Sequence, residues 1–134
     1  MLFSAALKDN KGFQRCFRSG RYCSCGFVTA YYFQNGGAGN RVGISVSKKI
    51  GNAVKRNRAK RIIRAAYRLN EDRFPIGCDI VFAARPDING RKMQDISHFI
   101  EHRLIKDMNK NLSSQEKTGA KKSRFKKNNK NENN

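Results

Sequence analysis

The stretch from Arg56 to Arg68 most constrains how this chain can fold, because it has the pattern of a helix with two opposite faces. At 3.6 residues per turn, its basic side chains recur at intervals of four residues and form one stripe. The stripe consists of Arg56, Lys60, Arg64 and Arg68, with Asn57 and Arg61 beside it. The opposite, apolar arc consists of Ala59, Ile62, Ile63, Ala66 and Leu69. We therefore predict an amphipathic helix that packs on a core and exposes a basic face.

The charge of this predicted helix favours a bound polyanion over a solvated face. No Asp or Glu occurs between Val46 and Asn70, whereas a solvated helix face normally mixes charges of both signs. Like charges four residues apart repel by roughly 0.2–0.5 kcal/mol per pair, and bound phosphates would relieve this repulsion. Arginine suits that role because its planar fork pairs with two phosphate oxygens at once. The sequence therefore predicts a nucleic-acid-binding helix.

The composition supports an acidic partner and one small domain. The chain of 134 residues holds 29 Lys and Arg against 10 Asp and Glu, a net charge of +19, and 38% of its residues are hydrophobic. A domain is predicted over residues 1–112, and the Lys- and Asn-rich tail, residues 113–134, is predicted to be disordered because it has few apolar residues to bury. No apolar run approaches the roughly 18 residues that span a bilayer, and no secretion signal is visible. We expect a cytoplasmic protein that does not enter membranes.

Periodicity and turn residues predict an α-β-β-β-α-β-α order, an α/β fold of the α+β sandwich type. The first helix begins at Asp9 or Asn10 and ends at Gly20. The later elements are one or two strands in Arg21–Phe33, a turn at Asn35–Asn40, a strand at Val42–Ser47, the basic helix from Asn52 to between Leu69 and Asp72, a strand at Cys78–Ala84 and a helix at Met93–Met108. The glycine-rich turn predicts that the strands on either side of it form a hairpin.

Neither the cysteines nor the histidines have the spacing of a complete metal site. The cysteines are Cys16, Cys23, Cys25 and Cys78, and their only close pair has C-x-C spacing. Structural zinc needs two well-placed ligand pairs, so free buried thiols are the better interpretation. His98 and His102 are four residues apart on a predicted helix, but no cysteine or carboxylate triad completes a ligand set. We interpret them as surface or interface residues.

Four aromatic residues, Phe13, Phe17, Tyr31 and Phe33, leave two interpretations open. Aromatic side chains at helix and strand spacing more often belong to a core, but exposed rings can also stack on nucleobases. A catalytic role of the protein itself is disfavoured, because its acidic residues form no motif for metal-dependent hydrolysis and no phosphate-loop or nucleophile motif occurs. No catalytic residue and no metal ligand is therefore predicted.

The run Arg41–Arg68, RVGISVSKKIGNAVKRNRAKRIIRAAYR, closely resembles the signature of the protein subunit of bacterial ribonuclease P. Leu7–Gly20 resembles the first helix of that family and Cys78–Pro86 its fourth strand, so the resemblance covers about residues 7 to 110. It implies a small mixed sheet in which the connection from the third strand through the basic helix to the fourth is left-handed, against the general preference. It also implies an endoribonuclease role, since in this family a magnesium-dependent RNA removes the 5′ leader of precursor tRNA with the help of the small basic protein.

The resemblance further implies roles for individual residues. Contact with the RNA subunit is implied for Lys48, Lys49, Asn52, Arg56, Asn57, Arg58, Lys60, Arg61, Arg64 and Arg68. A cleft for the single-stranded leader is implied for Phe13, Phe17 and Tyr31. The segment Arg21–Gly26 is one residue off the common family length, and a one-residue slip reverses the faces of a strand, so Tyr32 is the alternative to Tyr31. Ala65 stands where many members carry an acidic residue, which makes this helix more purely basic.

The partners implied by the resemblance are ribonuclease P RNA and precursor tRNA, with one monomeric protein per RNA. Mg²⁺ is expected to be held mainly by the RNA subunit and the substrate. On this hypothesis the protein adds affinity and discrimination to a cleavage that the RNA performs. The alternative is a non-catalytic RNA-binding protein of another ribonucleoprotein, such as a ribosomal or assembly factor, with a similar charge pattern. DNA binding is a third option, disfavoured because no helix-turn-helix or dimerisation pattern is present.

Overall fold

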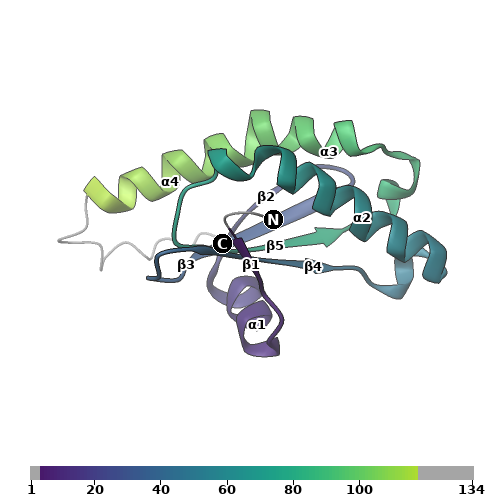
Figure 1. Ribbon diagram of the computed structural model, residues 1–134, viewed down its shortest axis with the longest axis horizontal. Helices are drawn as coiled ribbons and strands as arrows, with labels where there is room; N and C mark the ends of the chain where they lie inside the picture. The colour runs from purple at the N-terminus through teal and green to yellow at the C-terminus, as the bar shows by residue number, and fades with distance from the viewer. Residues whose placement is uncertain (1–3, 118–134) are drawn as a thin grey trace.

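The computed structural model describes residues 4–117, with side chains described over residues 4–112. It has three layers: helix α1 lies on one face of a five-stranded sheet, and helices α2, α3 and α4 lie on the other (Figure 1). The strands are β1 Ser4–Ala6, β2 Arg21–Ser24, β3 Val28–Gln34, β4 Asn40–Ser45 and β5 Cys78–Ala84. The helices are α1 Asn10–Ser19, α2 Ala53–Asn70, α3 Met93–Phe99 and α4 Ile105–Lys117. The predicted class and element order are confirmed, with β1 as an addition.

The sheet is mixed, with the spatial order β1-β4-β5-β3-β2. Strands β1, β4 and β5 run parallel, whereas β3 pairs antiparallel with both β5 and β2. The predicted hairpin across the Asn35–Asn40 turn is therefore wrong, because β5 lies between the two strands. The turn is bonded to the start of β5 instead: the amide of Asn35 donates to the Gly77 carbonyl at 2.8 Å, and Asn40 Oδ1 accepts from the Cys78 amide at 2.8 Å.

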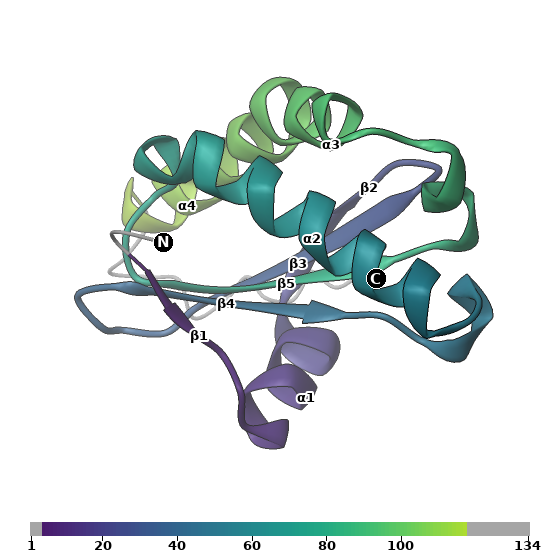
Figure 2. The same cartoon turned by 45° about the vertical axis from the view of Figure 1, so that its right-hand side comes forward.

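The connection from β4 through α2 to β5 is left-handed. In Figure 2 the chain runs rightward along β4 at the front, returns leftward as α2 above the sheet, and runs rightward again along β5 behind β4. This sense of rotation is rare among connections between parallel strands. It confirms the left-handed crossover that the resemblance implied.

The main core lies between the sheet and the three helices above it. Strand β5 is its centre, with Ile80 and Phe82 fully buried, and α2 contributes Ala59, Ile63 and Ala66 as predicted. The prediction for Leu69 is wrong, because 61% of its surface is exposed and Tyr67 is buried instead. The buried arc of α2 thus includes Tyr67 and Asn70, and the Asn70 side chain donates to Ser97 Oγ of α3 at 3.0 Å.

Helix α1 packs on the opposite face through a smaller core of Leu7, Cys16 and Val81. Asp9 caps its first turn by accepting from the Gly12 amide at 3.2 Å, and the chain leaves the helix at Gly20, as predicted. Strand β1, which pairs with β4, is too short to show a periodicity, and the sequence analysis missed it. Between β1 and β2 the chain thus passes along the face of the sheet opposite α2, as helix α1.

The predicted C-terminal helix is confirmed, but it is longer than expected. Helices α3 and α4 are joined by a π-helical segment, Ile100–Leu104, and α4 extends to Lys117. The domain boundary predicted between residues 112 and 113 therefore falls inside α4. The rest of the predicted disordered tail, residues 118–134, lies outside the described residues.

Candidate RNA-binding surfaces

The sheet face that carries α1 presents its side chains in three rows, which follow from strand register. The row nearest the Asn35–Asn40 turn consists of Arg41, Asp79 and Phe33. The central row consists of Gly43, Val81, Tyr31 and Tyr22. The third row consists of Ser45, Ala83, Thr29 and Ser24. These rows differ in chemistry: the first holds the two charged residues, the second holds two tyrosines, and the third consists of small, mostly polar residues.

We define the aromatic cleft as Phe13 and Phe17 of α1 together with Tyr31 of β3. The rings of Phe13 and Phe17 are 6.4 Å apart, and Phe17 meets Tyr31 edge to face at 4.9 Å. The floor beneath Phe13 is Gly43, where a Cβ atom would lie only 2.5 Å from Phe13 Cζ. The side chain of Phe17 is 38% exposed, and those of Phe13 and Tyr31 are half-buried. The structure therefore brings the three predicted cleft residues together, with part of each ring accessible.

The register of β3 decides between the two tyrosines. Tyr31 lies on the α1 face, beside Phe17, whereas Tyr32 points into the main core and is 1% exposed. The Tyr32 hydroxyl donates to Asp107 Oδ2 of α4 at 2.6 Å and accepts from Asn111 at 2.7 Å. Burial, followed by the bond to Asp107, raises the pKa of Tyr32. Tyr31 is thus the cleft residue and Tyr32 a core residue.

A buried ionic cluster fixes α1 beside the cleft. Asp79 is fully buried, accepts from Arg41 through both carboxylate oxygens at 2.9 and 2.8 Å, and accepts from Asn35 at 2.9 Å. Arg15 of α1 approaches Asp79 at 3.6 Å and lies over the ring of Phe33. Burial raises the pKa of Asp79, but the bonds from Arg41 and Asn35 and the charges of both arginines outweigh it and hold the pKa below its usual value.

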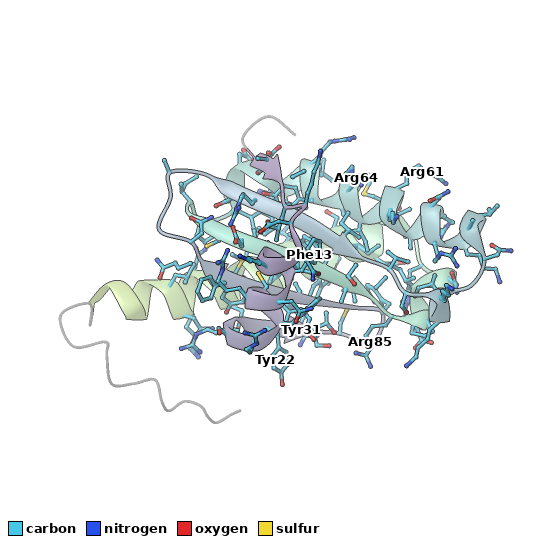
Figure 3. All side chains as sticks on the ribbon, turned by 90° about the horizontal axis from the view of Figure 1, so that it is seen from below. Phe13, Tyr22, Tyr31, Arg61, Arg64 and Arg85 are labelled. Atoms are coloured by element: carbon cyan, nitrogen blue, oxygen red, sulfur yellow. The ribbon has the colours of Figure 1, made fainter. Side chains whose placement is uncertain are left out.

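Arg85 is a basic residue beside the cleft that the sequence analysis missed. It follows β5 directly, on the alternation that places Val81 and Ala83 on the α1 face, and it is exposed. It donates to Thr29 Oγ1 in the third row at 3.4 Å, and Figure 3 shows it on the same side of the molecule as Tyr31. Extending the period-two pattern of the strand by one step would have found it.

The ten residues predicted to bind RNA lie on α2 and on the segment before it. Lys48 and Lys49 are exposed in a 3₁₀ turn, and Asn52 caps α2 by accepting from the Lys55 amide at 3.0 Å. Two of the arginines also hold the backbone, since Arg56 donates to the Gly51 carbonyl and Arg58 to the Arg91 carbonyl, each at 2.6 Å. The predicted residues on α2 that are exposed are Asn57, Lys60, Arg61, Arg64 and Arg68. We define these five as the basic face.

The basic face and the aromatic cleft have a fixed order across the molecule. Figure 3 views the structure from the α1 side, with Arg61 and Arg64 toward one edge of the sheet. Phe13, Tyr31 and Tyr22 then follow in that order away from the two arginines. A strand of RNA that passes from the basic face across the cleft would therefore meet Phe13 first.

Over the described residues, no group of three or more His, Cys, Asp or Glu side chains could hold a metal ion. The four cysteines are free; Cys16 and Cys78 are buried, and Cys23 and Cys25 are half-buried. His98 and His102 are exposed, with their ring centroids 4.3 Å apart and the rings inclined by 37°. Among residues 4–117, no helix has the length and apolar character needed to cross a membrane.

Comparison with known proteins decides the family. A family model described as Ribonuclease P matches residues 2–108. The chain belongs to the ribonuclease P protein family. Ribonuclease P protein components from Pelotomaculum thermopropionicum and Brevibacillus brevis are 42% and 44% identical to it, over 70% and 74% of this chain and 84% and 79% of those proteins.

Solved structures of the family share the fold. The ribonuclease P protein of Staphylococcus aureus aligns with a TM-score of 0.66 and 33% identity, covering 76% of this chain and 92% of that one. The protein from Thermotoga maritima aligns with a TM-score of 0.68 and 26% identity, covering 76% and 96%. The three-layer architecture and mixed sheet described above are therefore those of the ribonuclease P protein family, which acts in tRNA processing.

Proposed function

We propose that this ribonuclease P protein binds the catalytic RNA of ribonuclease P through its basic face and the 5′ leader of precursor tRNA through its aromatic cleft. The observation that carries the proposal is the coexistence of two surfaces with different chemistry. The basic face carries four cationic side chains and the amide of Asn57 and fits phosphates, whereas the aromatic cleft presents partly accessible rings. Together they would assist the endonucleolytic removal of the leader that gives the mature 5′ end of tRNA.

The basic face suits a folded RNA. The guanidinium groups of Arg61, Arg64 and Arg68 make no hydrogen bond or ion pair among the described residues, so they are available to phosphates. Lys48 and Lys49 extend the positive charge beyond the start of α2. Because such contacts release counterions from RNA, binding would weaken steeply as salt rises. Asn52, Arg56 and Arg58 would contribute in part by holding the segment around α2 in place.

The aromatic cleft suits an unpaired strand. Single-stranded bases can splay apart and stack on aromatic rings, whereas bases in a duplex present only their edges. Stacking tolerates any base, which matches a leader of variable sequence. The cleft would therefore distinguish precursor from mature tRNA by the presence of the leader and not by its sequence.

In this proposal the RNA subunit performs the reaction, and no protein residue is catalytic. Mg²⁺ would be held mainly by the RNA subunit and the substrate. The protein would act as one monomer per RNA in the cytoplasm, and its charge would lower the magnesium concentration that the RNA requires.

Cleavage of a 5′-labelled precursor tRNA tests the proposal. A bacterial ribonuclease P RNA is incubated at low magnesium with and without this protein, and the protein alone serves as the control. We expect mature 5′ ends only when RNA and protein are both present. A folded, RNA-binding protein that gives no stimulation would point to another ribonucleoprotein, and cleavage by the protein alone would show that catalytic residues exist.

A further inference from the structure

Tyr22 continues the aromatic cleft beyond the three residues assigned to it. It lies on β2, directly opposite Tyr31 in the antiparallel register, and therefore on the α1 face of the sheet. The two rings are 6.0 Å apart and inclined by 49°. The rings of Phe13, Phe17, Tyr31 and Tyr22 thus form one continuous row, in which each contacts the next.

Tyr22 is the most accessible ring of this row. Its side chain is 66% exposed, compared with 38% for Phe17. Its hydroxyl makes no hydrogen bond within the part of the chain that the structure describes. The pairing with Tyr31 can also stabilise β2, but it leaves most of the Tyr22 side chain exposed. The free ring face is what a stacking base requires.

The position of Tyr22 at the sheet edge sets which part of a bound strand it can reach. From Gly43 under Phe13 to Tyr22 the central row crosses four neighbouring strands, or about 14 Å at the usual strand spacing. One base cannot contact both ends of a row of that length. Tyr22 also lies farthest from Arg61 and Arg64 among the labelled aromatic residues (Figure 3). Any base on it is thus distinct from the base on Phe13.

We propose that Tyr22 is a fourth base-stacking position, which binds an unpaired leader nucleotide farther from the cleavage site than the nucleotides held by Phe13, Phe17 and Tyr31. This inference rests on the proposed function, since it assumes that the cleft holds the leader. It adds a length requirement: a leader that is too short to reach β2 gains nothing from Tyr22. Leader length is therefore the variable that isolates this residue.

The test measures the affinity of the reconstituted holoenzyme for precursor tRNAs whose leaders are extended one nucleotide at a time. For Tyr22→Ala we expect an affinity loss of about 5-fold or more with long leaders and no change with short ones. Tyr22→Phe, which keeps the ring, should match the unchanged protein. Ile76→Ala removes a similarly exposed apolar side chain outside the cleft and serves as the matched control.

A second measurement locates the stacked base. A fluorescent adenine analogue, whose emission falls when it stacks, is placed at successive leader positions. Tyr22→Ala should restore emission at one position, and Phe13→Ala at another position nearer the cleavage site. Equal losses at every leader length, or no loss with Tyr22→Ala while Phe13→Ala still weakens leader binding, would overturn the role of Tyr22 and leave the proposed function standing. An unchanged protein that binds precursor and mature tRNA equally would overturn both.

Discussion

The ring of Phe13 lies against Gly43 so closely that a Cβ atom on this glycine would stand 2.5 Å from Phe13 Cζ. Gly43→Ala should therefore push the ring out of the cleft. We expect an overpacking cost of about 1–3 kcal/mol in the free energy of unfolding, together with reduced preference for precursor over mature tRNA. Urea unfolding and binding of both tRNAs check this. A stable variant with full leader preference would show that the position of Phe13 is not what the cleft requires.

Tyr31 and Tyr32 are adjacent in the chain, but substituting each should have a different effect. Tyr31→Ala should weaken precursor binding, because it removes a cleft ring. Tyr32→Phe should destabilise the fold by about 1–3 kcal/mol, because Asp107 and Asn111 lose a buried hydroxyl partner, and should leave leader preference unchanged. Thermal unfolding and tRNA binding measured on both variants separate the two effects. Loss of leader preference in Tyr32→Phe alone would reverse the assignment.

The basic face should show itself in the salt dependence of holoenzyme assembly. Replacing Arg61 and Arg64 together by Ala should lower affinity for the RNA subunit and reduce the slope of log affinity against log salt by about 0.7–0.9 for each phosphate that the variant no longer neutralises. Binding is measured across a series of salt concentrations. Lys106→Ala, which removes an exposed positive charge on α4, is the control. A reduction per removed charge that is as large for Lys106→Ala as for the double variant would mean that net charge, and not the basic face, drives assembly.

The contribution of Asp79 to the stability of the fold should be lost at acid pH. Its pKa is held below the usual value in the folded protein, so its contribution to stability is complete above the ordinary carboxyl value of about 3.9 and is lost as the pH falls below it toward the lowered pKa. Asp79→Asn should cost about 2–3 kcal/mol at neutral pH, because an amide group would face two arginines, both of them partly exposed. Urea unfolding from neutral to acidic pH tests both statements. An unchanged acid limb in the variant would contradict them.

The two buried cysteines, Cys16 and Cys78, should resist alkylation in the native protein. Burial, with a smaller effect of the Asp79 charge, raises the pKa of Cys16 and of Cys78 to about 11. At pH 8 these thiols are almost wholly protonated and enclosed, so iodoacetamide should leave them unmodified in the native protein. Both should react once the protein is unfolded in urea. Mass spectrometry of digested protein gives the sites, and native labelling of Cys16 would contradict the packing of α1.

The sequence predicted best where local chemistry and tertiary structure agree. Asp9 and Gly20 bound α1 as expected, because capping depends on neighbours within one turn. The hairpin failed because the turn's own residues bond to the segment that precedes β5, through Asn35 and Asn40, and such partners are distant in the chain. The prediction for Leu69 was wrong for a similar reason, since which arc of α2 is buried is settled by its packing on distant elements such as α3.

The sequence could predict only some of the residues of the aromatic cleft. Phe13 and Phe17 follow from helical spacing, but the faces of Tyr31 and Tyr32 depend on strand register, which the irregular segment before β3 leaves open. The contributions of Tyr22 and Arg85 required the order of the strands, because Tyr22 becomes a neighbour of the cleft only through the pairing of β2 with β3. The roles of all these residues remain predictions for the experiments above.

Strand β5 is the last strand in the chain and the middle strand of the sheet. Until the ribosome has released Cys78–Ala84, β3 and β4 have no partner between them, and Val81 is missing from the floor under α1. The pairs β2–β3 and β1–β4 do not contact each other without β5, and a nascent chain that ends before β5 lacks Val81 under the cleft. The floor of the aromatic cleft is therefore complete only after β5, the last strand in the chain, has been made.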